Sequence, residues 1–312
     1  MISCKASATD SGALRKTTTR KMPTLAVFSQ SAMSARWLIR ISGARQRGAE
    51  PAQAAHKAFV TLKKIEKALS KSLADSDIAR ANALKQGERL RLQPETFECL
   101  KLAQSLSQQT AKAFDPAAGT LVDFWTRQQA ATVANAACGN GGGFCEEMPE
   151  WRAAFENFRF GAFSLDDNSV EIVCDNAGAK LDLGGIAKGF ALKKMAEDLE
   201  SLGIESALLS AGGSTILALD APEGRDKGWE IALGNRPETI SIKNEALSSS
   251  GAPQRKTCIV DPRSGLPATT TNPTRVIARD PAVADALSTA LAVMSPAERA
   301  QFATTMPHIK IL

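Results

Sequence analysis

Apolar side chains recur at steps of three and four residues in several parts of the chain, the spacing of one helix face. The clearest case is residues 51–70, where Phe59 and Leu62 share a side and Lys63 falls away from it. The same spacing predicts helices over residues 94–110, after Gly189 to residue 202, and over 281–294. The sequence from Ser295 to Glu298 is a capping box, so a final helix is expected to begin there.

Short apolar runs bounded by turn residues predict the strands. Residues 163–173 are expected to form a hairpin with its turn at 166–168. Further strands are predicted over residues 35–41, 207–210, 229–233, 239–242, 258–260, 274–278 and 308–312. Two stretches are predicted to lack helix and strand: the hydroxyl-rich residues 247–251, expected to be a turn, and the glycine-rich residues 128–144. The chain therefore mixes α and β elements.

Composition adds one further feature, a basic N-terminal stretch. The 312 residues are 44% hydrophobic and 23% charged, with a net charge of +5, which is ordinary for a globular protein of one large or two smaller domains. Much of the positive excess lies in residues 1–22, where Asp10 is the only acidic residue. That stretch has the composition of a transit peptide, but a disordered leader or an upstream start codon is the reading we favour.

Several function classes are not supported by the sequence. Aromatic residues make up only 5% of the chain and follow no basic stripe, so no nucleic-acid partner is expected. No apolar run reaches the length of a transmembrane helix, and no signal peptide is visible. The six cysteines form no C-x-x-C pair, so a zinc site is not expected. Without an export signal, Cys138 and Cys145 are expected to be free thiols rather than a disulfide.

The stretch with the clearest chemistry is residues 181–202. An extended segment runs into Gly184 and Gly185, and a helix follows Lys188 and Gly189. A glycine turn at a helix N-terminus exposes unpaired N–H groups to an anion, and Lys188 adds a positive charge. The same pattern also fits a tight strand-to-helix turn with a surface lysine, so this stretch by itself leaves both readings open.

Several spaced motifs, taken in order, resemble the ApbE family, the FAD:protein FMN transferases. Residues 182–189, DLGGIAKG, look like the family's glycine motif, and 284–290, ADALSTA, look like its helix motif ADALATA. Similar matches are Met33 before Trp37, Phe114-Asp115-Pro116 with Gly119 and Trp125, Gly212-Gly213, Ser250-Gly251, and Asp261 to Gly265 as DPRSG. The resemblance covers roughly Met33 to Met306. It implies one α+β domain over residues 23–312, with mixed sheets, helices outside, and a fold related to the T-fold.

The resemblance also implies the ligands and the residues that hold them. FAD is the implied substrate, and Mg²⁺ is the implied metal. The residues that would line FAD are Met33, Ala113, Phe114, Asp115, Asp182, Lys188 and Ile259. The Gly185 carbonyl, Asp285, Ser288 and Thr289 would hold the metal. The last three lie at i, i+3 and i+4 on one predicted helix face, and oxygen ligands suit Mg²⁺, although a plain polar face has the same spacing.

The implied reaction transfers FMN from FAD to a threonine or serine hydroxyl of an acceptor protein and releases AMP. Lys188 would offset the charge of the pyrophosphate, and Asp285 would help to take the hydroxyl proton. Two alternatives stay open: a flavin-binding protein that has lost transfer, and a Mg²⁺-dependent FAD pyrophosphatase that uses water. The localisation is not fixed by the sequence. The cytoplasm is the default expectation, although family members are often periplasmic or membrane-anchored.

The chain departs from the family pattern at four positions. Cys258 stands where the family commonly has histidine, and Lys193 stands where it has aspartate. Ser72 replaces a frequent aromatic residue, and Ser214 replaces an Asp or Asn after the second glycine pair. The set expected to hold the metal is therefore better kept than the set expected to face the substrates.

Overall fold

The structure is a computed structural model, and it describes most of the chain. The described residues are 25–43, 50–136, 148–159, 162–222, 224–233, 238–251, 259–268 and 272–312, with backbone only from 130 to 136. The expected leader at residues 1–22 lies outside them, as do Cys138, Cys145 and Cys258. Among the described residues, no helix is long and apolar enough to cross a membrane.

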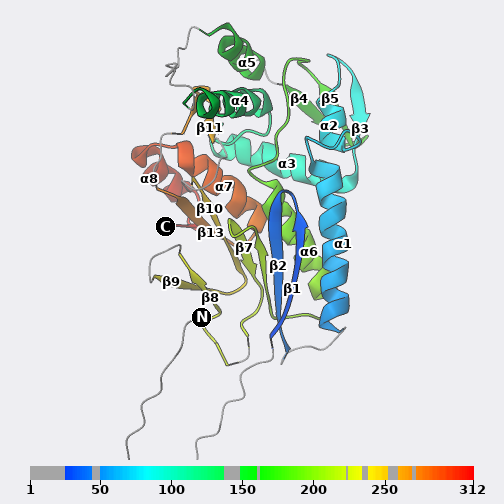
Figure 1. The fold of residues 1–312 in the computed structure, drawn as a ribbon, viewed down its shortest axis with the longest axis vertical. Helices are drawn as coiled ribbons and strands as arrows, with labels where there is room; N and C mark the ends of the chain where they lie inside the picture. The colour runs from blue at the N-terminus through cyan, green and yellow to red at the C-terminus, as the bar shows by residue number, and fades with distance from the viewer. Residues whose placement is uncertain are drawn as a thin grey trace, which may run out of the picture.

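A seven-stranded sheet forms the centre of the fold, with strand order β1-β2-β6-β7-β10-β13-β14 (Figure 1). Its strands are β1 (Leu25–Ala32), β2 (Ala35–Ser42), β6 (Ala207–Ala211), β7 (Thr215–Ala218), β10 (Glu245–Ser250), β13 (Thr274–Ala278) and β14 (Lys310–Ile311). Every neighbouring pair in this sheet is antiparallel. The expected α+β class is confirmed, but the expectation of mixed sheets is wrong: tight hairpins join β1 to β2 and β6 to β7, and a hairpin reverses the strand direction.

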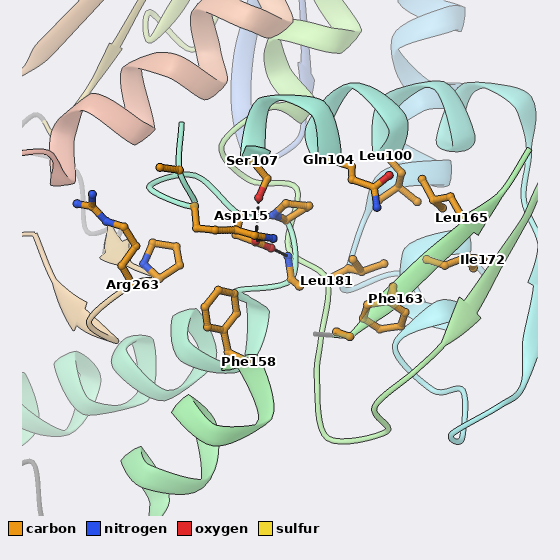
Figure 2. A pocket seen from close by; sticks show the side chains of 16 residues that line it. Leu100, Gln104, Ser107, Asp115, Phe158, Phe163, Leu165, Ile172, Leu181 and Arg263 are labelled. Carbon is orange, nitrogen blue, oxygen red and sulfur yellow. Dashed lines mark hydrogen bonds and ion pairs between the residues drawn. The ribbon is translucent and has the colours of Figure 1, made fainter. Parts of the chain in front are cut away.

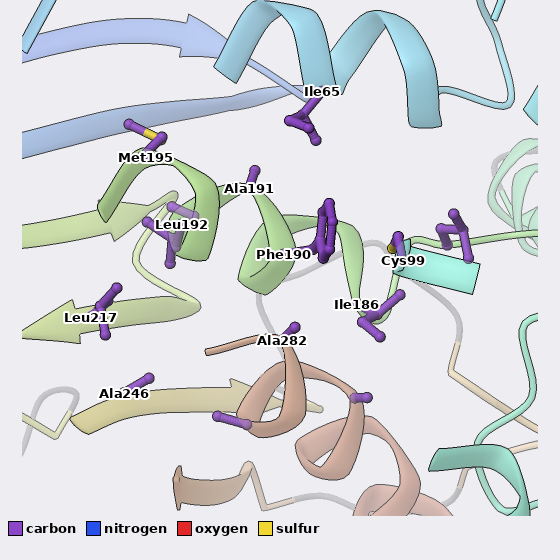
Figure 3. Packing of buried hydrophobic residues seen from close by; sticks show 14 of the residues in the cluster. Ile65, Cys99, Ile186, Phe190, Ala191, Leu192, Met195, Leu217, Ala246 and Ala282 are labelled. Atoms are coloured by element: carbon purple, nitrogen blue, oxygen red, sulfur yellow. The ribbon is translucent and has the colours of Figure 1, made fainter. Parts of the chain in front are cut away.

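Three helices cover one face of this sheet and enclose the main core. They are α1 (Pro51–Leu69), α6 (Ala187–Ser201) and α7 (Pro281–Val293). Figure 3 shows Ile65 of α1 on one side of α6, above Ala191, with Leu217 of β7 and Ala246 of β10 on the other side; all four belong to one buried cluster. Phe190 and Met195 of α6 are fully buried, so α6 is the central helix of this layer.

The opposite face of the sheet is covered by a small hairpin. Strands β8 (Trp229–Ala232) and β9 (Thr239–Ile242) pair with each other, and Trp229 packs on Leu208 and Leu247. Because successive strand residues point to opposite faces, Leu247 enters this second cluster while its neighbour Ala246 enters the main core. The central strands of the sheet are therefore buried on both faces, whereas Leu25 and Val27 of β1 are exposed.

The remaining elements gather beyond one end of the main sheet (Figure 1). They are α2 (Asp77–Ala81), α3 (Pro94–Gln109), α4 (Gly119–Ala136), α5 (Pro149–Arg159), the sheet β3 (Arg89–Arg91), β5 (Glu171–Cys174) and β4 (Phe163–Asp166), and the pair β11 (Val260–Asp261) and β12 (Leu266–Pro267). Helix α8 (Pro296–Thr305) follows α7. The predicted 163–173 hairpin is confirmed as β4 and β5, and the capping box of α8 is present.

Two predictions of irregular structure are wrong. The stretch 247–251 was expected to be a turn, but its first four residues belong to β10, a central strand paired on both sides. Its serines look turn-like in sequence, yet inside the sheet the Ser248 hydroxyl donates to the buried Asp285 carboxylate, and the Ser250 hydroxyl lies within hydrogen-bond distance of Ser288. For the stretch 128–144, expected to lack structure, the prediction is wrong as far as Ala136, where α4 ends, since its small alanine-rich residues favour a helix; residues 137–144 lie outside the described residues.

Candidate functional site

The glycine turn leads directly into the central helix. Residues 184–186 form the turn, and α6 begins at Ala187, so Lys188 and Gly189 lie in its first helical turn. The Lys188 Nζ donates to the Gly184 carbonyl over 3.1 Å, which folds the lysine back over the glycines. The predicted turn and helix N-terminus are therefore present, with the lysine charge beside them.

Gly189 needs to be a glycine because α6 and α7 touch there. A Cβ added to Gly189 would lie 2.1 Å from the Pro281 carbonyl oxygen at the start of α7. The close approach lets the Gly189 N–H donate to Asp285 Oδ2 over 3.0 Å. The glycine motif and the α7 motif, almost 100 residues apart along the sequence, are thus joined by a hydrogen bond between backbone and carboxylate.

Asp285 is a buried carboxylate, only 3% exposed, and it accepts hydrogen bonds on both oxygens. Oδ1 accepts from the Thr215 hydroxyl at 2.9 Å and from the Ser248 hydroxyl at 3.1 Å. Oδ2 accepts from the Gly189 N–H. Among the described residues, no lysine, arginine or histidine forms an ion pair with it. A buried anion that has hydrogen bonds but no counter-charge favours the approach of a cation.

The other residues predicted to hold the metal lie around Asp285. The Ser288 hydroxyl donates to the Asp285 backbone carbonyl at 2.9 Å, and the Thr289 hydroxyl contacts the same oxygen at 3.3 Å. The Ser250 hydroxyl lies 2.8 Å from that of Ser288 and 3.2 Å from that of Thr289. A Cβ on Gly185 would lie 3.1 Å from Thr289 Oγ1, so the glycine turn reaches this group. The structure therefore brings all four predicted metal residues together.

The chemistry of this group suits a hard cation. One carboxylate, several hydroxyls and the backbone of a glycine turn offer oxygen atoms only, which is the ligand type that Mg²⁺ prefers. The described residues contain no cluster of three or more His, Cys, Asp or Glu side chains that would bind a metal by itself. A cation at Asp285 would therefore depend on hydroxyl and carbonyl oxygens, and on oxygens brought by a substrate.

The Phe114-Asp115-Pro116 turn lies against the glycine turn. A Cβ on Gly185 would be 3.2 Å from the Phe114 ring, and the Asp182 N–H donates to the Pro116 carbonyl at 2.8 Å. Ala113 and Phe114 are buried, 1% and 4% exposed. These contacts place Phe114, one of the residues predicted to line FAD, against Gly185, and they tie the segment of Asp182 to the turn that contains Phe114.

Asp115 is held by three donors. Its Oδ2 accepts from the Ser107 hydroxyl and from Lys112 Nζ, both at 2.8 Å, and its Oδ1 accepts from the Ala117 N–H at 2.9 Å. The Asp115 carboxylate therefore stabilises the turn through the Ala117 N–H and connects the turn to the end of α3 through Ser107.

A cavity of about 490 Å³ opens beside this turn. Figure 2 shows Asp115 and Ser107 near its centre, Phe158 of α5 on one side and Phe163 of β4 on another. The other lining residues labelled there are Leu100, Gln104, Leu165, Ile172, Leu181 and Arg263, so the walls are largely apolar with a polar centre. Such a shape suits a flat, partly polar ring system.

Asp182 lies in a pair with a lysine that the sequence reading did not single out. Lys71 Nζ lies 2.6 Å from Asp182 Oδ2 and 2.8 Å from Asp123 Oδ1. Partial burial disfavours the charge on Lys71, but attraction to Asp182 and Asp123 outweighs this and raises its pKa. The other oxygen of Asp182 accepts from the Gly184 N–H at 2.7 Å, which shapes the glycine turn.

Met33 and Ile259, two more residues predicted to line FAD, lie at other places. Met33 is in the turn between β1 and β2 at a φ of 47°, and its N–H donates to Glu66 of α1. Ile259 precedes β11, and its carbonyl accepts from the Ala268 N–H at 2.7 Å. In the described part of the chain their hydrogen bonds do not reach Asp285, so the structure does not bring these two into the central group.

Comparison with known proteins identifies the family. A model described as the ApbE family matches residues 33–312. The chain belongs to the ApbE family. The resemblance seen in the sequence is therefore confirmed, and over almost the same span.

Named relatives and solved structures agree with this assignment. The FAD:protein FMN transferase of Treponema pallidum (strain Nichols) is 27% identical over 269 residues, which span 79% of this chain and 72% of that protein. The FAD:protein FMN transferase of Klebsiella pneumoniae (strain 342) is 25% identical, over 68% of this chain and 66% of that one. The ApbE protein from Thermotoga maritima has a TM-score of 0.77 at 24% identity, covering 93% and 94% of the two chains. This last likeness confirms the α+β single-domain fold.

The structure explains one departure from the ApbE family pattern. Lys193 Nζ lies 3.0 Å from Asp280, the residue whose side chain caps α7 by accepting from the Ala282 and Val283 N–H groups. It also lies 3.8 Å from Glu98 of α3. The lysine therefore faces two acidic partners, and the reversed charge fits its surroundings in this chain.

The other departures have different outcomes. Ser214 is buried, and its hydroxyl donates to the Ala211 carbonyl at 3.1 Å within the turn between β6 and β7. Ser72 is exposed in the loop after α1, where its N–H donates to the Ser70 hydroxyl at 3.2 Å. Cys258 lies outside the described residues.

Sequence reasoning missed Thr215, Ser248 and Lys71. Thr215 and Ser248 lie on different strands, and only the pairing of β7 with β10 sets them side by side. The alternation of buried positions in those strands was the available signal. It indicates which face of the sheet a side chain occupies, but it does not indicate which other side chain it contacts. Lys71 sits in a polar loop and meets Asp182 only through the tertiary fold.

Proposed function

We propose that this protein transfers FMN from FAD to a threonine or serine hydroxyl of an acceptor protein, with Mg²⁺ as the metal, and releases AMP. The observation that carries the proposal is the buried Asp285 carboxylate, which accepts from two hydroxyls and the Gly189 N–H and has no ion-pair partner among the described residues. Membership of the ApbE family and relatives named FAD:protein FMN transferase support the same reaction.

In this proposal Mg²⁺ binds the Gly185 carbonyl, Asp285, Ser288 and Thr289. The cation supplies positive charge to the phosphate oxygens of the substrate. Three of the roughly four acceptor positions of the Asp285 carboxylate are already filled by donors, which leaves one for a cation. The role of proton acceptor proposed for Asp285 uses the same position, so Asp285 would serve chiefly to hold the metal.

FAD is proposed to lie along the glycine turn. The Lys188 side chain and the positive end of the α6 dipole attract its phosphates, because a helix N-terminus carries positive partial charge. Asp182 and the buried Ala113, Phe114 and Asp115 would line the nucleotide near the glycine turn, and Met33 and Ile259 would line it further from Asp285. The cavity beside Asp115 is proposed to bind the ring system at one end of FAD.

The proposed step is a displacement at phosphorus. The acceptor oxygen forms a bond to the FMN phosphorus, the bond from that phosphorus to the bridging oxygen breaks, and AMP leaves with that oxygen. The hydroxyl proton passes to solvent water as the new bond forms, and the departing AMP keeps the bridging oxygen as one of its phosphate oxygens. Lys188 holds the phosphates in place and offsets the charge that grows on their oxygens, so positioning and charge do most of the work.

A transfer assay tests the proposal. The full chain is incubated with FAD, Mg²⁺ and an acceptor that carries the family's threonine-containing target motif, then covalent flavin fluorescence on a denaturing gel and free AMP are measured. The Asp285→Ala variant is compared with Asp75→Ala, which removes an exposed aspartate whose partner is Lys67. We expect labelled acceptor and AMP from the unmodified chain and from Asp75→Ala, and neither from Asp285→Ala or after EDTA.

The other outcomes are equally informative. AMP without labelled acceptor would identify an FAD pyrophosphatase and overturn the transfer. Bound FAD with neither product would point to a flavin-binding protein without transfer. Labelling that survives in Asp285→Ala, with the variant folded by its melting temperature, would remove the metal assignment.

A further inference from the structure

Thr215 and Ser248 form a cross-strand pair beneath α7. Antiparallel pairing of β7 with β10 sets the two residues directly opposite each other. Both are fully buried, 0% exposed, and their hydroxyl oxygens are 3.2 Å apart. They point to the face of the sheet that carries the main core, the same face as Leu217 and Ala246. The central strands thus present two hydroxyls to the helix above them.

The count of hydrogens shows where these hydroxyls donate. Each hydroxyl has one hydrogen to give. Thr215 has two possible acceptors, Asp285 Oδ1 at 2.9 Å and the Ser248 oxygen at 3.2 Å. Ser248 has Asp285 Oδ1 at 3.1 Å and the Ser214 carbonyl at 3.4 Å. The charged and nearer acceptor is the stronger one, so both hydrogens go to the carboxylate.

The Thr215 and Ser248 hydroxyls and the Gly189 N–H donate to the Asp285 carboxylate from three directions. The two hydroxyls hold Oδ1 from the sheet below, and the amide holds Oδ2 from α6. Rotation of the carboxylate about its own axis would break at least two of the three bonds. The Ser248 hydroxyl oxygen also lies 3.2 Å from that of Ser288, which places it next to a second proposed ligand.

We propose that Thr215 and Ser248 are positioning residues that orient Asp285 for the divalent cation. This inference rests on the proposed function, because it takes Asp285 as a metal ligand. Neither hydroxyl touches the cation; each fixes the direction of the one free acceptor position on the carboxylate. Residues that hold a metal ligand in this way set metal affinity, and their loss typically weakens it by about 10- to 100-fold.

The structure supplies a matched control for the key substitution. Thr215→Val keeps the shape of the side chain and removes the hydroxyl. Thr274 lies in β13 of the same sheet, is 3% exposed, and its hydroxyl has no hydrogen-bond partner among the described residues. Thr274→Val therefore makes the same chemical change at a buried strand position where no carboxylate is held.

The test measures binding of Mn²⁺ to the full chain by electron paramagnetic resonance, with and without FAD, together with the Mg²⁺ dependence of AMP release. We expect Thr215→Val to raise the Kd for Mn²⁺ about 10-fold and the KM for Mg²⁺ by a similar factor, with a smaller change in kcat. Thr215→Ser keeps the hydroxyl donor, so its Kd for Mn²⁺ should stay within about 2-fold of that of the unmodified chain. Thr274→Val should bind Mn²⁺ as tightly as the unmodified chain does. Ser248→Ala gives a second, independent removal of a donor.

Two results would overturn the inference separately from the proposed function. If Asp285→Ala binds Mn²⁺ as well as the unmodified chain does, the metal site itself is wrong. If Asp285→Ala loses Mn²⁺ while Thr215→Val and Ser248→Ala keep it, the metal site stands and the positioning role is wrong. A Thr215→Val protein that melts too early to assay leaves the decision to Ser248→Ala and to the comparison of Thr215→Ser with the unmodified chain.

Discussion

Gly189 donates its backbone N–H to the Asp285 carboxylate over 3.0 Å, and this bond exists only because α6 and α7 approach so closely. The two residues belong to separate sequence motifs, the glycine motif at the start of α6 and the helix motif of α7. A side chain at position 189 would meet the Pro281 backbone at 2.1 Å, so the contact admits no Cβ. The glycine thus serves the site by bringing a donor to a buried anion.

Replacing this glycine is expected to damage both stability and metal binding. Gly189→Ala forces α6 and α7 apart, and overpacking of this kind costs about 1 to 3 kcal/mol. Chemical denaturation measures the loss, and Mn²⁺ binding measures the effect on Asp285. Gly87→Ala, in an open turn before β3 at a φ of 83°, is the comparison. The Gly87→Ala variant is expected to lose stability through backbone strain but to keep its Mn²⁺ binding. Equal Mn²⁺ binding in Gly87→Ala and Gly189→Ala would contradict the role given to Gly189.

Lys71 is expected to support nucleotide binding through Asp182. Lys71→Met keeps the apolar stem but leaves Asp182 without its cation, 2.6 Å away in the structure. A partly exposed ion pair is worth up to about 1 kcal/mol, so FAD should bind about 2- to 5-fold more weakly. Flavin fluorescence titration measures this. Lys67→Met removes an exposed lysine paired with Asp75 and should leave FAD affinity unchanged; a matching loss there would mean that general positive charge, and not Asp182, is responsible.

Lys193 is expected to stabilise the start of α7. Lys193→Asp removes its pairs with Asp280 and Glu98 and places a third carboxylate beside them. Like charges at this distance should cost about 1 kcal/mol, seen as a lower urea midpoint that high salt partly restores. Lys227→Asp makes the same change at an exposed position. A variant as stable as the unmodified chain would show that the aspartate common in the family is tolerated here.

Glu298 is expected to make stability fall at low pH. Its carboxylate accepts from the Ser295 N–H in the capping box and pairs with Arg263, and these interactions lower its pKa from 4.5 to about 2. Because the folded pKa lies below the unfolded one, the stabilisation is complete above about pH 4.5 and is lost as the pH falls towards 2. Urea denaturation from pH 6 to pH 2 should therefore show a shallower fall for Glu298→Gln. Parallel curves for the two proteins would contradict this.

The sequence by itself determined the elements whose signal is local. The helix periodicity of 51–70 and 281–294, the hairpin turn at 166–168 and the Ser295–Glu298 capping box each depend on residues within a few positions of one another. The ordered motifs also indicated the family, and the family resemblance implied a metal site at Gly185, Asp285, Ser288 and Thr289, which the fold gathers into one group.

Only the tertiary structure decided which side chains hold Asp285. Thr215 and Ser248 are separated by 33 residues along the chain, and strand pairing alone makes them neighbours. The serines of β10 look like a turn to any local reading, because their propensity disfavours a buried strand when no partner is in view. The carboxylate that pairs with Ser248 comes from a helix 37 positions further on. Burial and hydrogen bonding between distant segments therefore override local preference at this site, and no pattern within a short window records them.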